Sequence, residues 1–223
     1  MSNLVLSHSE RPFAPPCHGA RGVVSLALVL WLMLVLLLGA NGWFLSPPGK
    51  PPFAILLGVA APLIAFFAAY RLSEAFRDLV LAADLRFMAA VQAWRFAGFG
   101  FLALYVHGVL PGVFAWPAGL GDMAIGIAAP WIIVALIRRP DFAAGKAFKA
   151  WNALGILDLV VAVGIGGLTS ALAVGAPGEI TARPMAEMPL VLIPGYLVPL
   201  FVMLHIASLL QARRMREAEP GTR

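Results

Sequence analysis

The residues QAWRFAGFGFLALYVHGVLPGVFAWPAGLGD, from Gln92 to Asp122, carry the information that decides the fold. Most of this stretch is apolar enough to lie in lipid, yet it contains Arg95, His107 and Asp122. An ionisable side chain within a hydrocarbon layer is costly, so it needs a partner or a water-filled cavity. The stretch therefore predicts two membrane-spanning helices joined by a turn, with polar groups inside the membrane.

The composition of the whole chain indicates a membrane protein. Of its 223 residues 61% are hydrophobic and 12% charged, and the mean hydropathy is +0.89. These values lie far outside the range of water-soluble globular domains. The net charge is +5, but Lys and Arg are spread over short segments between apolar runs and form no basic face. We expect a lipid bilayer as the partner, and no nucleic acid.

Six apolar segments are long enough to cross a hydrocarbon core of about 30 Å. They cover about 23–44, 53–70, 87–110, 115–137, 150–174 and 190–210. The first is longer than the hydrophobic region of a usual signal peptide, so we interpret it as an uncleaved span. The predicted fold is an all-α integral membrane protein. A single six-span domain covers 22–212, between a flexible tail at 1–21 and a basic tail at 213–223.

The basic residues predict how the chain crosses the membrane. Alternate connecting segments contain thirteen Lys and Arg residues against two in the others. By the positive-inside rule, both termini are then cytoplasmic, which requires an even number of spans. Between the second and third spans, Arg71 to Phe87 has Leu72, Phe76 and Val80 on one helical face, which predicts a short amphipathic helix at the membrane surface. The expected location is a bacterial inner membrane.

Polar and ionisable residues inside the predicted spans are the candidate functional residues. They are Gln92, Arg95, His107, Asp122, Asn152, Asp158 and His205. At a rise of about 1.5 Å per residue, Arg95, Asp158 and His205 reach a similar depth from the cytoplasmic side. We expect Arg95 to pair with Asp158, and Asn152 or Gln92 to complete the hydrogen bonds of the arginine. Such a pair either holds two helices together or handles a proton or substrate.

His107 and Asp122 are predicted to lie nearer the outer face. The fourth span begins between Val113 and Ala118, with Pro117 as a plausible first helical residue. His107 and Asp122 then either form a pair able to titrate near neutral pH or each face interfacial water. The uncharged connection between them is either a plain hairpin or a buried re-entrant turn.

No cofactor or metal is expected from the sequence. His107 and His205 are predicted at opposite depths, so they cannot ligate a single haem iron. Clustered His, Cys and carboxylate ligands of the kind that hold a metal ion do not occur in the spans. Cys17 is the only cysteine, which excludes an intrachain disulfide.

Gly119, Gly121 and Asp122 form a GxGD sequence that resembles the catalytic motif of presenilin-like and prepilin-peptidase-like intramembrane aspartyl proteases. The resemblance implies a second aspartate sharing a proton with Asp122, and Asp158 is the deeply placed candidate. The chain departs from the family pattern in three ways. It has no Tyr-Asp motif and no downstream Pro-Ala-Leu motif, and Asp158 follows the GxGD segment instead of preceding it.

These patterns support one leading functional hypothesis and two alternatives. The leading one is a small transporter or permease-like protein for a small molecule or ion, with Arg95 and Asp158 as its polar core and His205, His107 and Asp122 as titratable or gating groups. The first alternative is a non-catalytic membrane scaffold or assembly factor, in which these residues only fix helix packing. The second is the aspartyl protease. Each is compatible with a homo-oligomer.

Overall fold

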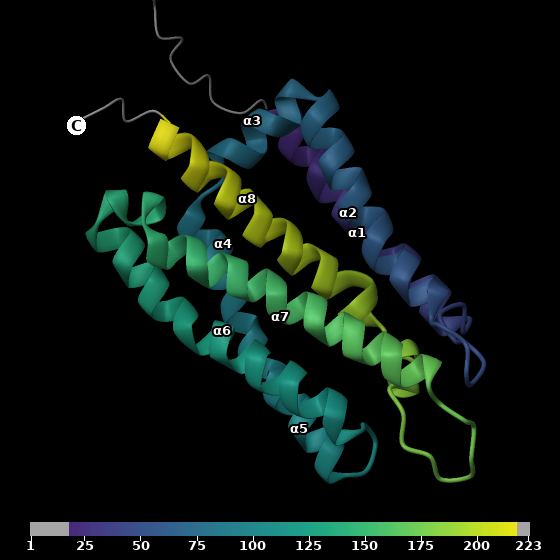
Figure 1. The fold of residues 1–223 in the computed structure, drawn as a ribbon. Helices are drawn as coiled ribbons and strands as arrows, with labels where there is room; N and C mark the ends of the chain where they lie inside the picture. The colour runs from purple at the N-terminus through teal and green to yellow at the C-terminus, as the bar shows by residue number, and fades with distance from the viewer. Residues whose placement is uncertain (1–17, 218–223) are drawn as a thin grey trace, which may run out of the picture.

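The computed structural model describes residues 18–217, and within them the only regular secondary structure is helical. Six helical segments are long and apolar enough to cross a membrane (Figure 1). They are Gly19–Ala40, Phe53–Leu72, Leu85–Val106, Gly112–Arg138, Lys146–Ala171 and Ile193–Glu217. The prediction of an all-helical chain with six such segments is confirmed.

Several of these segments consist of more than one helical element. In chain order the elements are α1 (His18–Ala40), α2 (Phe53–Leu72), α3 (Glu74–Ala82), α4 (Leu85–Gln92), η1 (Ala93–Gly98), α5 (Phe99–Val106), α6 (Gly112–Arg138), η2 (Pro140–Ala144), α7 (Lys146–Ala171), η3 (Arg183–Ala186), η4 (Ile193–Leu197) and α8 (Val198–Glu217). Helices α1 and α8 extend into parts of the two predicted tails. The rest of those tails, with Cys17, lies outside the described residues.

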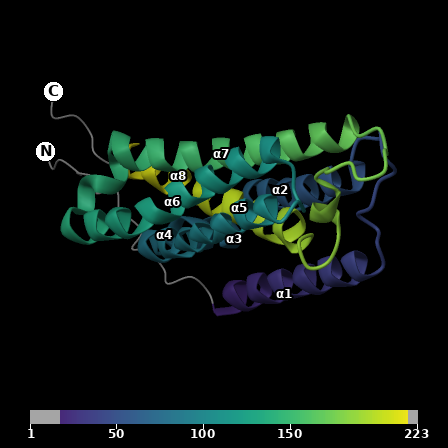
Figure 2. The ribbon, with the colours of Figure 1, turned by 90° about the horizontal axis from the view of Figure 1, so that it is seen from below.

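Both ends of the described chain lie at the same end of the bundle (Figure 2), as an even number of crossings requires. We call this the terminal end. It also holds α3 and the connection 139–145. The opposite, distal end holds the connections 41–52, 107–111 and 172–192.

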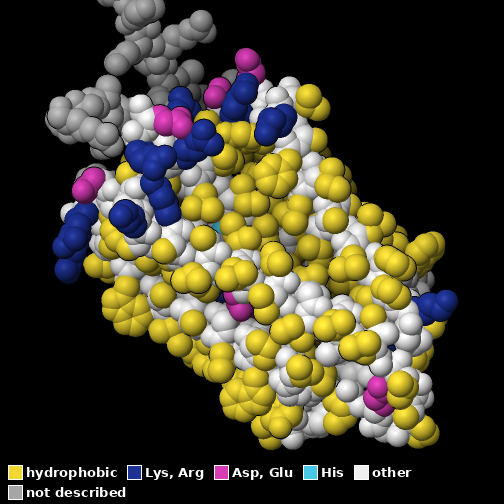
Figure 3. Space-filling view, viewed as in Figure 1, with side chains coloured by type: hydrophobic (Ala, Val, Ile, Leu, Met, Phe, Trp, Pro, Cys, Tyr) yellow, Lys and Arg dark blue, Asp and Glu magenta, His cyan; other side chains and the backbone are white. Residues whose placement is uncertain are grey.

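Figure 3 shows hydrophobic side chains over the middle of the bundle, with Lys and Arg gathered at the terminal end. In the distal connections, the Lys and Arg residues are Lys50 and Arg183. This distribution is typical of a protein whose middle lies in lipid.

Helix α6 forms the centre of one half of the bundle, packed on α4, η1 and α5 on one side and on α7 on the other. Glycines let its backbone approach η1 closely. A Cβ atom added to Gly126 would lie 2.3 Å from the backbone nitrogen of Phe96, and one added to Gly119 would lie 3.0 Å from the carbonyl oxygen of Gly98. Small residues of this kind are the usual means of close helix packing in membranes. The contact places η1 directly against the middle of α6.

Two local predictions need correction. Helix α6 begins at Gly112, after Pro111, so Pro117 lies inside the helix. The preceding connection is a short hairpin, in which Gly108 has a φ of +71° and residues 107–109 are exposed, so it is not a buried re-entrant turn. Leu72 ends α2 and is 86% exposed, so it does not share an apolar face with Val80 of α3.

A separate helix, α3, begins after Leu72 instead. The Ser73 Oγ accepts a hydrogen bond from the backbone N–H of Phe76 at 3.2 Å, which caps the first turn of α3. Asp84 caps α4 in the same way, by accepting from the N–H of Arg86 at 2.8 Å.

Candidate functional site

Arg95 lies at the centre of the bundle with none of its side chain exposed. Its Nε donates to Oδ1 of Asp122 at 2.7 Å, and its Nη2 donates to Oδ2 of Asp158. Its Nη1 donates to the carbonyl oxygen of Gly155 at 3.2 Å and lies 3.0 Å from Nε2 of His205. The guanidinium therefore joins η1 to α6, α7 and α8, and four of its five N–H groups have partners. We call these residues the Arg95 cluster.

The partners of His205 determine its protonation state. A guanidinium only donates hydrogen bonds, so Nε2 of His205 must be the acceptor in the contact with Arg95. The proton of the imidazole is then on Nδ1, which donates to Oδ1 of Asn152 at 2.9 Å. The amide nitrogen of Asn152 donates in turn to the carbonyl oxygen of Phe148 at 2.9 Å. This chain of bonds holds His205, which is 0% exposed, as a neutral imidazole.

The Arg95 cluster has one negative charge in excess when both carboxylates are ionised. It contains one guanidinium, two aspartates and a neutral histidine. Nε and Nη2 form one edge of the guanidinium, so the carboxylates of Asp122 and Asp158 lie side by side. An uncompensated charge is expensive in a low-dielectric interior. One proton or one monovalent cation taken up at the carboxylates neutralises the cluster.

Three glycines leave the space that the cluster occupies. A Cβ atom on Gly121 would lie 1.7 Å from Oδ1 of Asp158, and one on Gly155 would lie 2.2 Å from Nε2 of His205. On Gly98, it would lie 2.5 Å from Cβ of Asp122. The positions of these glycines in three apolar helices are a signal in the sequence that the depth of the charged residues did not use.

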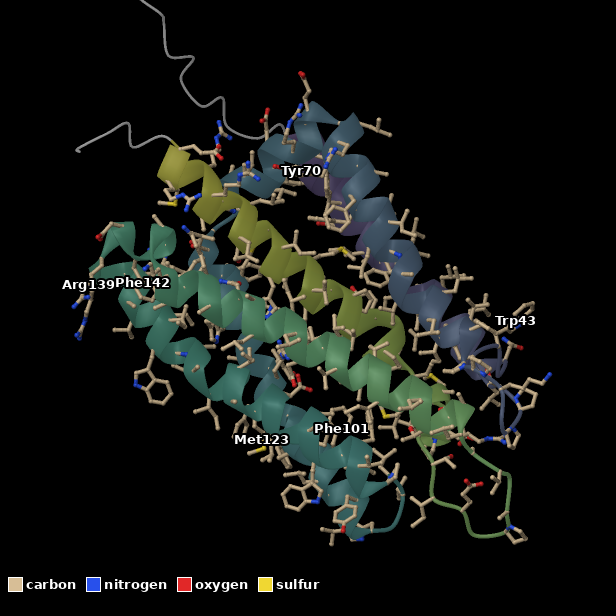
Figure 4. All side chains as sticks on the ribbon, viewed as in Figure 1. Trp43, Tyr70, Phe101, Met123, Arg139 and Phe142 are labelled. Atoms are coloured by element: carbon tan, nitrogen blue, oxygen red, sulfur yellow. The ribbon has the colours of Figure 1, made fainter. Side chains whose placement is uncertain are left out.

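A cavity of about 290 Å³ leads from the distal connections to Asp122. Its walls are mainly apolar and include Phe101, seen in Figure 4 where α5 faces α7. The charged side chains that line it are Lys50, Asp122, Glu179 and Arg183. Of these, only Asp122 comes from a membrane-spanning helix. The side chains of Asp122 and Asp158 are 16% and 14% exposed, so the carboxylates form the accessible side of a cluster whose arginine is enclosed.

The expected grouping of Arg95, Asp158 and His205 is confirmed. Asn152 and Gln92, the side chains that were predicted to complete the hydrogen bonds of Arg95, do not bond it. Asn152 bonds His205 instead of Arg95. Gln92 donates through Nε2 to the carbonyl oxygen of Phe201 at 3.1 Å, and its buried Oε1 has no partner among the described residues. A backbone carbonyl, that of Gly155, accepts the bond that Asn152 or Gln92 was expected to accept.

His107 and Asp122 do not form a pair. His107 lies exposed in the turn after α5, whereas Asp122 bonds Arg95. Because α6 begins at Gly112, Asp122 lies about 15 Å along the helix from the distal end, and Arg95 lies about 16 Å from the end of α5. The two residues that were predicted in separate layers therefore share one.

The comparisons with known proteins identify a family without an assigned activity. Residues 52–213 match a family model described as a domain of unknown function, DUF8737, and the chain belongs to this family. The match begins after α1 and includes every residue of the Arg95 cluster. No curated protein and no solved structure matches the chain. Within residues 18–217, no group of three or more His, Cys, Asp or Glu side chains is placed to hold a metal ion.

Proposed function

We propose that this protein is a proton-coupled transporter of a small molecule, in which the cavity admits the substrate and the Arg95 cluster exchanges the proton. The observation that carries this proposal is the cavity of about 290 Å³ that leads to Asp122. This volume is close to the lower end for small-molecule sites, roughly 300 Å³. A buried ion pair that served only to hold helices together would need no access from the end of the bundle.

The membrane orientation is part of the same proposal. The basic residues at the terminal end favour a cytoplasmic location for both termini, in a bacterial inner membrane. The cavity then opens to the outer face, and α3 lies at the cytoplasmic membrane surface with Glu74 and Asp78 exposed. In this orientation a substrate enters from outside and meets the carboxylates about halfway across.

Two irregular turns, one that contains Arg95 and one that lines the cavity, suggest how the cavity changes its access. Arg95 lies in η1, a 3₁₀ turn between α4 and α5. The π-helical turn η4 precedes α8, and its Ile193 and Pro194 line the cavity. Irregular helical turns often mark hinges and substrate sites in membrane transporters. We infer that repacking at η1 and η4 closes the cavity on one side of the membrane and opens it on the other.

The two alternative functions receive less support from this geometry. A scaffold accounts for the ion pairs but not for the cavity that reaches them. In an intramembrane protease, two aspartates share a proton and act on a water molecule. Here Arg95 donates to both Asp122 and Asp158, so a guanidinium edge contacts both carboxylates, and the Tyr-Asp and Pro-Ala-Leu motifs of those proteases are absent from the sequence.

The test is proton movement in proteoliposomes that contain a pH-sensitive dye. A pH gradient is imposed, and small cations, anions and zwitterions are added in turn. We expect at least one class to dissipate the gradient, and Asp158→Asn to reduce the rate at least tenfold. Asp84→Asn, at an exposed carboxylate outside the cluster, is the matched control and should behave as wild type.

Folding is checked for each variant by its elution in size-exclusion chromatography and its helical circular dichroism. If folded wild-type protein moves no protons with any class of compound, the transporter proposal is wrong. A scaffold is favoured if, in addition, single changes at Arg95 and Asp158 unfold the protein while a paired apolar replacement leaves it stable.

A further inference from the structure

We propose that the cavity binds a small organic cation, whose ammonium group contacts Asp122 and takes the place of the proton. This assignment rests on the proposed function and names its class of substrate. It also specifies the transport mode, which is the exchange of one cation for one proton. The supporting observations are the walls of the cavity, its charged groups and the charge of the Arg95 cluster.

The walls of the cavity suit an ammonium group with apolar substituents. Phe44, Phe101 and Phe114 line it, and the rings of Phe101 and Phe114 meet edge to face with centroids 5.6 Å apart. Aromatic faces attract cations, most strongly where water is excluded. A bare inorganic cation instead needs several oxygen ligands. The wall that α7 contributes around Leu159 and Val163 offers carbon atoms in their place.

Lys50, Glu179 and Arg183 line the mouth of the cavity, and the last two are already engaged. The carboxylate of Glu179 accepts hydrogen bonds from the backbone N–H groups of residues 174–176, and these bonds, that of Val174 first, lower the pKa of Glu179. Arg183 donates to the carboxylate of Glu187 at 3.3 Å. Asp122 is therefore the carboxylate that a ligand meets inside the membrane, and a negatively charged ligand would be repelled there.

Asp122 retains an oxygen for this ligand. Its Oδ1 accepts from Nε of Arg95, and no described residue donates to its Oδ2. The side chain lines the cavity and is 16% exposed. An ammonium group at the inner end of the cavity can therefore approach Asp122 without displacing Arg95.

The charge of the Arg95 cluster implies that the organic cation and the proton exchange for each other. With both aspartates ionised, the cluster has one excess negative charge, because Arg95 balances only one of them. A proton neutralises this charge, and so does one organic cation. Both together would leave a net positive charge in a low-dielectric site. Cation and proton therefore exclude each other, and one leaves when the other binds.

The first experiment measures binding to the purified full-length protein by isothermal titration calorimetry. The probes are choline, tetraethylammonium and benzyltrimethylammonium, with 3,3-dimethylbutanol as the uncharged isostere of choline. Quaternary ammonium groups cannot release a proton, so any proton released on binding comes from the protein. At low pH, we expect close to one proton to be released for each cation bound. As the pH falls and the cluster becomes protonated, the affinity for the cation should fall about tenfold per pH unit.

Variants identify the group that binds the cation. We expect Asp122→Asn to weaken binding at least tenfold and to abolish proton release. Asp84→Asn, at an exposed carboxylate outside the cavity, should leave both unchanged. Ala162→Phe fills the cavity while keeping every charged group, and should abolish binding even if Asp122→Asn does not fold. The proposal is overturned if no probe binds, if 3,3-dimethylbutanol binds as tightly as choline, or if binding survives both substitutions.

Proteoliposomes separate this proposal from the transporter proposal. One-for-one exchange is electroneutral, so an inward cation gradient should drive protons outward at a rate that a potassium–valinomycin voltage clamp does not change. If an anion or zwitterion moves protons and no cation binds, the substrate class is wrong and the transporter proposal stands. If cations bind with proton release but nothing crosses the membrane, the binding site stands and the transporter proposal falls.

Discussion

Nη1 of Arg95 and Nε2 of His205 lie 3.0 Å apart at the centre of the bundle. Because the guanidinium can only donate, the contact requires an unprotonated Nε2 and a neutral imidazole. His205 therefore supports Arg95 without adding a positive charge. The two aspartates that share Arg95 are left with one charge unbalanced, and the exchange proposed for this site follows from that.

We expect nitrogen-15 NMR of His205 to show a protonated Nδ1 and an unprotonated Nε2 at neutral pH. Asn152→Asp should disturb this state, because a carboxylate beside Nδ1 favours an imidazolium that cannot accept from Arg95. The variant should lose about 1–3 kcal/mol of stability, the usual cost of an unsatisfied buried group. A protonated Nε2 in the wild-type protein would contradict the assignment of a neutral histidine.

Removing the arginine should be more damaging than removing a surface charge. Arg95→Ala leaves Asp122 and Asp158 next to each other without their cation, and breaking a buried pair in this way costs about 3–5 kcal/mol. Arg86→Ala, at an exposed pair with Asp84, should change stability by no more than about 1 kcal/mol. Unfolding in detergent, followed by circular dichroism, measures both. Equal losses would show that the cluster contributes no more than a surface ion pair.

Gly121→Ala should destabilise the protein because the new Cβ would lie 1.7 Å from Oδ1 of Asp158. The carboxylate has to move, and overpacking of this kind costs about 1–3 kcal/mol. Gly164→Ala is the matched control, since it also lies in a membrane-spanning helix and its added Cβ would meet no atom within 4 Å. It should be neutral or stabilising by up to about 1 kcal/mol. Equal stability of the two variants would exclude the close contact at Gly121.

Reporter fusions test the orientation. A reporter placed after Arg223 should be cytoplasmic, and one inserted at Gly178, in a turn of the distal end where its φ is +79°, should lie outside. Cysteine substituted at Lys50 should react with an impermeant maleimide added to whole cells. A reporter after Arg223 that proves to be outside the cytoplasm would reverse the orientation and, with it, the side to which the cavity opens.

The sequence alone was sufficient to predict the number of spans and the pairing of Arg95 with Asp158. The length of an apolar run is a local property, and a regular helical rise converts position in the chain into depth. The depth of each residue, counted from the cytoplasmic end of its span, was enough to predict that Arg95, Asp158 and His205 share one layer. Depth placed Asp122 too near the outer face, because the fourth span was predicted to begin between Val113 and Ala118 and α6 begins at Gly112.

The tertiary structure decided which side chains face one another at a given depth. The rotation of each helix about its axis depends on its neighbours, and here glycines such as Gly121 and Gly155 let the helices approach closely enough for Asp158 and His205 to reach Arg95. The cavity also required the assembled fold, because its walls come from several helices and from two distant connections. The charged residues of the site could therefore be identified from the sequence, while their partners and their access were set by packing.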